Sequence, residues 1–313
     1  MIKAGIIGVG HLGKIHLKLL NVSKNFELVG YHDLKKLDEL NNFVFFKNVK
    51  DLIINSDAIF ICTNTPYHYE YAQICLNLNK HIFIEKPITS NIKDAKTLLN
   101  LSSKKKLKIQ VGHVERFNAG FQCIKNEIKK PKFIECHRLA EFNPRGNDVS
   151  VVLDLMIHDI DIVLSLIRSK PKVINANAVC VINDTPDICN ARVEFESGEV
   201  ANFTASRISQ KNMRKSRFFQ SNAYISVDFL NKKTEVVKIR DYDEKNPYSL
   251  VIENSKGLKK EIFYENPTIN ENNAIQDEHD SFAKSINLDK EPEVSATDGY
   301  NALKLANQII ERL

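Results

Sequence analysis

The chain opens with Ile2-Lys3-Ala4-Gly5-Ile6-Ile7-Gly8-Val9-Gly10-His11-Leu12-Gly13. Residues 2–7 are mostly small or branched and apolar, which predicts a short strand buried on both faces. Apolar residues then recur at helical spacing from Leu12 to Leu20, so the G-x-G-x-x-G pattern lies where a strand turns into a helix. Glycine suits such a turn because the backbone must approach a pyrophosphate, whose charge the N–H groups at the helix start then bind. We therefore expect a dinucleotide-binding turn formed by Gly8, Gly10, His11, Leu12 and Gly13.

The composition is that of an ordinary globular protein. The 313 residues are enough for two domains, and the shares of 43% hydrophobic and 27% charged residues are typical. The net charge of +5 is small, and no basic stripe with interleaved aromatic residues is present, so we expect no nucleic-acid partner. No apolar run reaches membrane-spanning length, and the N-terminus is interpreted as a strand rather than a signal peptide. We expect a cytoplasmic protein with no membrane partner.

The cysteines form no C-x-x-C pair, and most lie within apolar runs. This pattern indicates buried free thiols in a reducing compartment rather than disulfides or metal ligands, and we expect no metal site. The six positions are Cys62, Cys75, Cys123, Cys136, Cys180 and Cys189.

A second predicted strand, residues 26–33, ends in an acid. Asp33 lies 20 residues after Gly13, where a carboxylate hydrogen-bonds the adenosine ribose hydroxyls and repels the extra phosphate of NADP. We therefore expect NAD rather than NADP, although Lys35 and Lys36 follow closely and oppose this argument. The alternative role of Asp33 is a simple turn former or helix cap.

Strands and helices go on alternating to residue 112. Strands are predicted at 57–63, 81–84 and 108–112, and helices at 70–78 and 92–101, which indicates a parallel α/β sheet. Ligands bind beyond the carboxyl ends of such strands, so we expect Thr63, Asn64, His68, Glu85 and Lys86 near the cofactor. His68 is equally well explained as a helix-start residue with no ligand.

Lys86 follows a strand and precedes Pro87, an arrangement that directs a cation into the crevice. We put forward a cis Lys86–Pro87 bond as a hypothesis. The alternative for this segment is a surface salt bridge between Glu85 and Lys86.

From Pro131 the pattern changes to strands that alternate apolar and polar residues, which predicts an antiparallel sheet. Glu196-Ser197-Gly198-Glu199 predicts a hairpin turn, and residues 241–247 are the most prone to disorder. Helices are predicted at 270–286 and 296–313. The strands are predicted at 133–142, 173–182, 187–195, 200–208, 223–229 and 234–239.

One helix, predicted at 151–164, interrupts these strands and carries a second group of candidate residues. Asp154 and His158 are four residues apart and so share a helix face, with Asp161 one turn further along. A carboxylate beside a histidine holds its tautomer and raises its basicity, as a general base for alcohol oxidation requires. The alternative is a structural Asp–His pair.

Taken together, these motifs resemble the glucose–fructose oxidoreductase, inositol dehydrogenase and MocA (Gfo/Idh/MocA) family. The resemblance rests on Gly8-x-Gly10-x-x-Gly13 with His16 on the next helix, on Glu85-Lys86-Pro87, and on Asp154-x-x-x-His158. It implies an α/β Rossmann domain over 1–120 and an α+β domain over 121–313 with a large, open, mainly antiparallel sheet. The C-terminal helix is expected to pack back on the first domain.

The resemblance also implies that Lys86, Asp154 and His158 form the catalytic group. One departure concerns the loop after Thr63, because the family often has Thr-Pro there and this chain has Thr63-Asn64.

Within the family, residues 112–118, 154–161 and 206–209 look like the branch of UDP-N-acetylglucosamine 3-dehydrogenases. Basic residues would then neutralise the diphosphate of a sugar nucleotide. The alternative is that they lie at strand ends and in solvated loops; Lys211 and Arg214 are further candidates. The substrate-binding candidates are Arg116, Asn118, Arg138, Arg145, Asp154, His158 and Arg207.

The resulting hypothesis is an NAD-dependent oxidoreductase that acts on a secondary hydroxyl of a sugar nucleotide, with the 3-hydroxyl of UDP-N-acetylglucosamine favoured. An inositol or free-sugar dehydrogenase of the same family is the enzyme alternative, and a non-catalytic NAD-binding sensor is the alternative of another class. We also expect a homodimer or homotetramer, because the open sheet needs a partner on its outer face.

Overall fold

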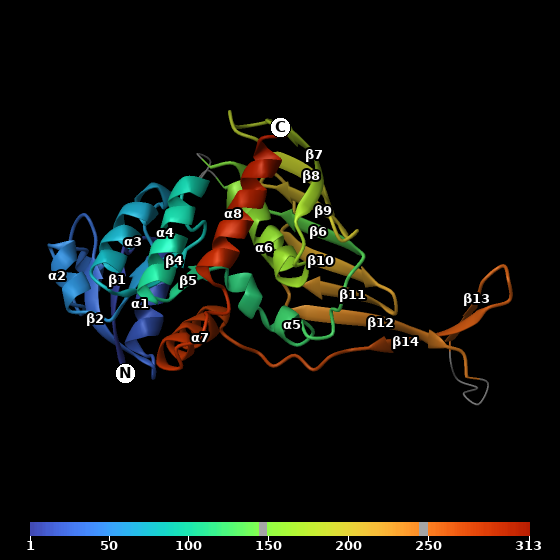
Figure 1. The fold of residues 1–313 in the computed structure, drawn as a ribbon, viewed down its shortest axis with the longest axis horizontal. Helices are drawn as coiled ribbons and strands as arrows, with labels where there is room; N and C mark the ends of the chain where they lie inside the picture. The colour runs from blue at the N-terminus through green and yellow to red at the C-terminus, as the bar shows by residue number, and fades with distance from the viewer. Residues whose placement is uncertain (144–148, 244–249) are drawn as a thin grey trace. The chain divides into compact units, whose positions relative to one another are not determined.

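The computed structural model describes residues 1–143, 149–243 and 250–313, which form two compact units (Figure 1). Unit 1 contains residues 1–114 and 273–304, and unit 2 contains residues 115–272 and 305–313. Contacts thus assign part of the C-terminal region to unit 1. The predicted division into domains at residue 120 stays a prediction. No helix in the described parts of the chain is long and apolar enough to cross a membrane.

Unit 1 is built on a five-stranded sheet in the order β2-β1-β3-β4-β5. All its pairings are parallel, and the inner strands are buried on both faces, as their apolar sequences predict. The strands are β1 (Ile2–Ile7), β2 (Phe26–His32), β3 (Ala58–Ile61), β4 (His81–Glu85) and β5 (Ile109–Gly112).

Helices follow the strands of unit 1, as the alternating pattern predicts. The short helix α2 is absent from the sequence prediction; Asn48, just before it, caps it by accepting a hydrogen bond from the Lys50 N–H. The elements are α1 (His11–Asn21), α2 (Val49–Ile54), α3 (His68–Asn77) and α4 (Ile92–Lys105), with the 3₁₀ turns η1 (Asp38–Leu40) and η2 (Thr65–Tyr67).

Two C-terminal helices, α7 (Ala274–Asn287) and α8 (Ala296–Ile310), begin within unit 1. Phe282 of α7 is fully buried, and its ring centroid lies 5.8 Å from that of Phe60. Gly299 of α8 approaches β5 so closely that a Cβ would lie 2.7 Å from Val111. Residues 273–304 therefore complete the core of unit 1.

Unit 2 contains a nine-stranded sheet in the order β13-β14-β12-β11-β10-β6-β9-β8-β7. Among the described strands only β6 and β9 pair in parallel, which confirms a large, mainly antiparallel sheet. The strands are β6 (Phe133–Leu139), β7 (Pro171–Val179), β8 (Ile188–Phe195), β9 (Val200–Ser206), β10 (Met213–Gln220), β11 (Ala223–Asp228), β12 (Lys233–Asp241), β13 (Leu250–Glu253) and β14 (Lys259–Glu265).

The two faces of this sheet differ. The turn η3 (Val114–Phe117) leads to α5 (Ala119–Gln122), and α5 and α6 (Ile157–Leu166) pack on one face, where Ile134, Phe203 and Phe218 are fully buried. On the opposite face Glu135, Asn202 and Arg217 are partly exposed. We call this second surface the open face (Figure 1).

The predicted helix at 151–164 is wrong as a single α-helix. Residues Val152–Met156 form a π-helical turn, η4, and α6 begins only at Ile157. The winding of a π-turn differs from that of an α-helix, so the shared face of Asp154 and His158 stays a prediction. Asp161 is buried and pairs with Arg116 instead of continuing their face.

Other local predictions can be compared directly. The hairpin at 196–199 is confirmed, with Gly198 at a φ of +93°. All six cysteines are free, and Cys75, Cys136 and Cys189 are buried, but Cys180 is exposed, contrary to expectation. Part of the stretch predicted to be disordered, residues 244–247, lies outside the described residues.

Candidate active site

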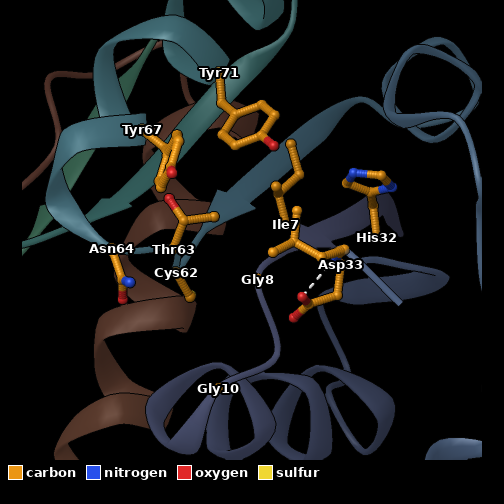
Figure 2. Close-up of a pocket in the computed structure, with 11 residues that line it drawn as sticks. Ile7, Gly8, Gly10, His32, Asp33, Cys62, Thr63, Asn64, Tyr67 and Tyr71 are labelled. Carbon is orange, nitrogen blue, oxygen red and sulfur yellow. Dashed lines mark hydrogen bonds between the residues drawn. The ribbon is translucent and has the colours of Figure 1, made fainter. Parts of the chain in front are cut away.

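A pocket of about 280 Å³ opens at the carboxyl ends of β1, β2 and β3. The strand order reverses between β1 and β3, and ligands of open α/β sheets bind at such a switch point. Figure 2 shows Gly10 on one side of the pocket, at the start of α1, and Tyr67 and Tyr71 on the other. The lining residues are Ile7, Gly8, Gly10, His32, Asp33, Leu34, Cys62, Thr63, Asn64, Tyr67 and Tyr71.

The three motif glycines have different roles. Gly8 has a φ of +87° and leaves no room for a side chain beside Thr63, whose backbone nitrogen would lie 2.8 Å from a Cβ. A Cβ on Gly13 would lie 2.0 Å from the Gly8 carbonyl oxygen. A Cβ on Gly10 would meet no atom within 4 Å, although Gly10 lines the pocket. Gly8 and Gly13 are thus required by the turn itself, whereas Gly10 leaves space that a pyrophosphate fits.

The start of α1 faces this space without a side-chain cap, because Gly10 is its N-cap residue. His11 and Leu12 open the helix, His11 exposed and Leu12 partly buried. Their backbone N–H groups belong to the first turn, which is where helices bind phosphate.

The contacts of Asp33 agree with its turn-forming role, and its binding of a cofactor ribose stays a prediction. Its Oδ2 accepts a hydrogen bond from the Val9 N–H at 2.8 Å, and its Oδ1 accepts one from the Leu34 N–H at 2.7 Å. It therefore ties β2 to the glycine turn, and it also lines the pocket. Each carboxylate oxygen has a second lone pair, so ribose hydroxyls can still be bound.

The loop after β3 completes the pocket. The hydroxyl Oγ1 of Thr63 is buried and finds no hydrogen-bond partner within the described residues, which is unusual for a native buried polar atom. Asn64 is exposed and lines the same pocket. An unsatisfied hydroxyl, the vacant space at Gly10 and the uncapped helix start together fit a bound dinucleotide.

His68 does not line the pocket. Its ring is 1% exposed, with Nδ1 2.9 Å from the Pro87 carbonyl oxygen and Nε2 2.9 Å from the Thr63 carbonyl oxygen. The ring thus connects the loops that follow β3 and β4, which favours its structural alternative. Tyr67 and Tyr71, four residues apart, line the pocket although no motif marks them; their place in and after the loop that follows β3 is the signal that was available.

Glu85 and Lys86 end β4. Glu85 is buried, and its Oε1 lies 2.9 Å from His16 Nε2 while its Oε2 accepts a hydrogen bond from the Lys86 N–H at 3.3 Å. Glu85 therefore belongs to the interior rather than to a surface salt bridge. The Lys86–Pro87 bond is cis, as hypothesised, and Lys86 is partly exposed.

In unit 2, Arg116 and Arg138 are bound to carboxylates. Arg116 donates to both oxygens of Asp161, at 2.6 and 2.8 Å. Arg138 donates to both oxygens of Asp159, at 3.1 and 2.9 Å, and to Glu115 at 2.9 Å. Burial raises the pKa of Asp159, and the Arg138 guanidinium opposes that rise. These two arginines already have buried counter-ions, so their charge is balanced within the unit.

Two further candidates are structural in their contacts. Asn118 accepts a hydrogen bond from the Gly120 N–H at 3.0 Å, and its side-chain amide donates to the Phe229 carbonyl oxygen at 2.8 Å. Arg214 is half-exposed and lies 3.5 Å from Glu115. Arg145 lies outside the described residues.

Arg207 keeps unused donors. Its Nη2 donates to the carbonyl oxygens of Val149 at 2.7 Å and Pro186 at 2.9 Å, and its Nε lies 3.7 Å from Asp187. Within the described chain, Nε and Nη1 have no hydrogen-bond partner. Burial by itself raises the pKa of Asp187. Hydrogen bonds from Asn183 and from neighbouring backbone N–H groups have the larger effect and hold that pKa well below its usual value.

Asp154 lies within the π-turn η4, and His158 lies in the first turn of α6. Both side chains are partly buried. Single π-turns inside helices occur frequently at functional sites, which agrees with the catalytic role predicted for this segment.

Residues 2–113 match the model of the GFO/IDH/MocA oxidoreductase family with an NAD-binding Rossmann fold, and residues 125–225 match the GFO/IDH/MocA C-terminal domain. The chain belongs to the GFO/IDH/MocA oxidoreductase family. It is accordingly a dehydrogenase that acts on a CH–OH group, and its unit 1 is an NAD(P)-binding Rossmann fold.

Among its relatives in this family, the chain is 32% identical to the UDP-N-acetylglucosamine 3-dehydrogenase of Acidithiobacillus ferrooxidans over 238 residues, which cover 75% of this chain and 76% of that protein. It is 23% identical to the myo-inositol 2-dehydrogenase of Thermotoga maritima, with 97% of this chain and 92% of that protein covered. A solved structure of the A. ferrooxidans enzyme has a TM-score of 0.89 at 28% identity, covering 100% of this chain and 97% of that one.

Proposed function

We propose that this protein is an NAD-dependent dehydrogenase that oxidises a secondary hydroxyl of a sugar nucleotide, and that the favoured substrate is the 3-hydroxyl of UDP-N-acetylglucosamine. The product is then a 3-keto sugar nucleotide. The observation that carries this proposal is the 32% identity, over three quarters of the chain, with a relative of that name. The structural likeness of the same enzyme over the whole chain supports it.

We assign the catalytic roles to Lys86, Asp154 and His158. His158 accepts the hydroxyl proton, Asp154 orients the imidazole, and Lys86 holds the reacting oxygen. When bound, the nicotinamide ring takes up the hydride, while the protein supplies position and electrostatics. The π-turn at Asp154 and the position of Lys86 at a strand's carboxyl end support these roles.

The preference for NAD over NADP rests on Asp33. Its carboxylate lines the pocket, where it suits the ribose hydroxyls and repels a ribose phosphate. Both oxygens also hold backbone N–H groups, so the charge is fixed in place.

A second candidate is an inositol or free-sugar dehydrogenase. The carboxylate partners of Arg116 and Arg138 favour it, because a substrate without a diphosphate needs no free guanidinium. Relatives named inositol 2-dehydrogenase point the same way, including one from Salmonella typhimurium that is 27% identical over 190 residues. Arg207 has two N–H donors without a partner among the described residues, but Asp187 lies 3.7 Å from its Nε, so its charge is balanced as well.

The experiment that decides between them measures NADH or NADPH formation with UDP-N-acetylglucosamine, myo-inositol and glucose, each with NAD and with NADP. Turnover with the sugar nucleotide alone supports the proposal, and turnover with a polyol alone rejects it in favour of the second candidate. If NAD binds and nothing reacts, the next step is to denature the purified protein. The absorbance of the released material at 340 nm then detects a tightly held NADH. A protein without such a cofactor and without turnover would be the non-catalytic sensor.

We also propose that the protein self-associates through the open face of the unit 2 sheet. The rings of Phe133, Phe219 and Tyr224 form a row across three neighbouring strands on that face, with centroids 5.8 and 5.1 Å apart. A row of aromatic side chains on a half-exposed sheet is typical of an interface.

A further inference from the structure

The Glu85 carboxylate is hydrogen-bonded to one imidazole ring, and that ring is hydrogen-bonded to a second. All three groups belong to unit 1. His16 of α1 places Nε2 2.9 Å from Glu85 Oε1 and Nδ1 2.7 Å from Nε2 of His279, which belongs to α7. His16 is 1% exposed and His279 is fully buried. Groups from the first helix, the fourth strand and a C-terminal helix thus form one continuous hydrogen-bonded chain.

The side chains around these three hydrogen-bonded groups are apolar and tightly packed. Phe60 lies 4.9 Å from the His279 ring, and Phe83 lies 5.2 Å from the His16 ring, measured between centroids. A Cβ on Gly112 would lie 2.7 Å from Glu85 Oε1, so glycine at this position leaves the carboxylate its room. Burial lowers the pKa of His279 well below its usual value, and a positive charge on His16 would lower it further.

Other titratable groups lie close by. Burial, and then the charges of Glu85 and Glu278, raise the pKa of the Cys62 thiol, which lines the cofactor pocket. The hydrogen-bonded chain therefore lies next to the pocket.

The chemistry of the three groups gives the hydrogen bonds a direction. A carboxylate only accepts, so the proton between Glu85 and His16 is on His16 Nε2. With one proton on each imidazole, His16 Nδ1 is bare and accepts from His279 Nε2–H. The remaining His279 Nδ1 has no partner among the described residues, which agrees with a ring whose proton is on the other nitrogen. The N–H of His279 and the N–H of His16 then both donate in the direction of Glu85.

We propose that His279 is a positioning residue for the reaction: through His16 it fixes the Glu85 carboxylate, and with it the segment that carries Lys86. The link to Lys86 is direct, because Glu85 Oε2 accepts the Lys86 backbone N–H. This inference rests on the proposed function for the role of Lys86. It adds a residue, 193 positions further along the chain, that holds the catalytic lysine in place without touching the substrate.

The test compares three variants of the full-length protein. His279→Leu removes the donor to His16, His279→Gln keeps an N–H near the position of Nε2, and Phe282→Leu changes packing on the same helix while leaving the chain of hydrogen bonds intact. The tautomer of His16 is observed by ¹⁵N NMR of histidine-labelled protein between pH 6 and 8, and kcat and KM are measured beside it.

We expect the Nε2–H tautomer of His16 in every variant, because Glu85 still accepts that proton, and a shifted ¹⁵N signal of His16 Nδ1, which loses its donor, in His279→Leu alone. We expect kcat to fall about tenfold in His279→Leu with both KM values within about twofold, and to be largely restored in His279→Gln, since a buried polar atom left without its partner costs enough for that change. An unchanged His16 Nδ1 signal in His279→Leu, or an equal loss of kcat in Phe282→Leu, overturns the inference. Full activity of Lys86→Met overturns the proposed role of the lysine instead, while the ¹⁵N signal of His16 Nδ1 still decides whether His279 donates to His16.

Discussion

At the scale of single residues, Asp33 holds the turn with its carboxylate and is also the residue to which we assign the ribose of the cofactor. Its oxygens bind the N–H groups of Val9 and Leu34, and the same group lines the pocket beside Gly10. Asparagine removes the charge and keeps one of the two hydrogen-bond acceptors, so one of these backbone contacts is lost together with the charge.

We therefore predict that Asp33→Asn increases the ratio of kcat/KM for NADP to that for NAD by about tenfold or more, because the repulsion of a ribose phosphate is lost. Initial rates with both cofactors measure the ratio. Asp38→Asn is the control, since Asp38 lies in η1 and does not line the pocket. An unchanged ratio in Asp33→Asn contradicts the assignment.

The proposed base gives a second prediction. His158→Ala removes the group that accepts the hydroxyl proton, so kcat falls by about 10²–10⁴, as is typical of general acid–base catalysis. The Kd for NAD, measured by fluorescence titration, stays within about twofold. Ser165→Ala, a change on the same helix α6, keeps its activity; comparable activity in the two variants would remove His158 from the mechanism.

Residue-scale prediction from the sequence succeeds where the function depends on a local pattern and fails where it depends on a partner. Gly8, Gly10 and Asp33 form the pocket as expected, because the turn and the strand end are defined by neighbouring residues. In the sequence, Arg116 and Arg138 can be recognised only as positive charges, because nothing nearby indicates their carboxylate partners. Their partners Asp161 and Asp159 come from another element, and only the packing of α6 on the sheet pairs them.

At the scale of elements, the turn from β1 to α1 offers a matched pair of substitutions. In Gly13→Ala the new Cβ would lie 2.0 Å from the Gly8 carbonyl oxygen, whereas in Gly10→Ala it would meet nothing within 4 Å. We predict that Gly13→Ala lowers the Tm by about 5 °C or more, because the backbone must shift to admit the methyl group.

Gly10→Ala is predicted to keep its Tm within about 2 °C and to weaken NAD binding by about tenfold or more, since its methyl group enters the space meant for the pyrophosphate. Thermal unfolding and fluorescence titration measure the two effects. Wild-type NAD affinity in Gly10→Ala would show that the cofactor lies elsewhere.

The elements missed by the sequence have physical explanations. β10 begins Met213-Arg214-Lys215, so it reads as a basic patch, although its buried positions Ser216 and Phe218 alternate as in a strand. The π-turn is invisible because the residues that form it, Val152–Met156, are also compatible with an α-helix. The local sequence predicts that a helix is present at this position. Tertiary packing then determines whether its first turn is α-helical or π-helical.

At the scale of the whole molecule, the open face predicts an assembly. Light scattering coupled to size-exclusion chromatography should give a mass at least twice that of the chain, and Phe219→Asp should reduce it, because a charge in the middle of the aromatic row cannot be buried without a partner. Phe219→Leu, which keeps an apolar side chain, is the control. A monomeric wild type would reject this interface.

The way α7 completes unit 1 has a consequence for biosynthesis. Residues 1–114 contain the whole parallel sheet, yet Phe282 fills its core and His279 binds His16 beneath Glu85. A ribosome that adds about 5–20 residues per second needs roughly 10–30 s to reach these positions after the sheet has been made. During that interval the nascent sheet exposes the rings of Phe60 and Phe83, which Phe282 will cover. The parallel sheet is therefore translated well before α7, and its core is complete only once α7 has been made.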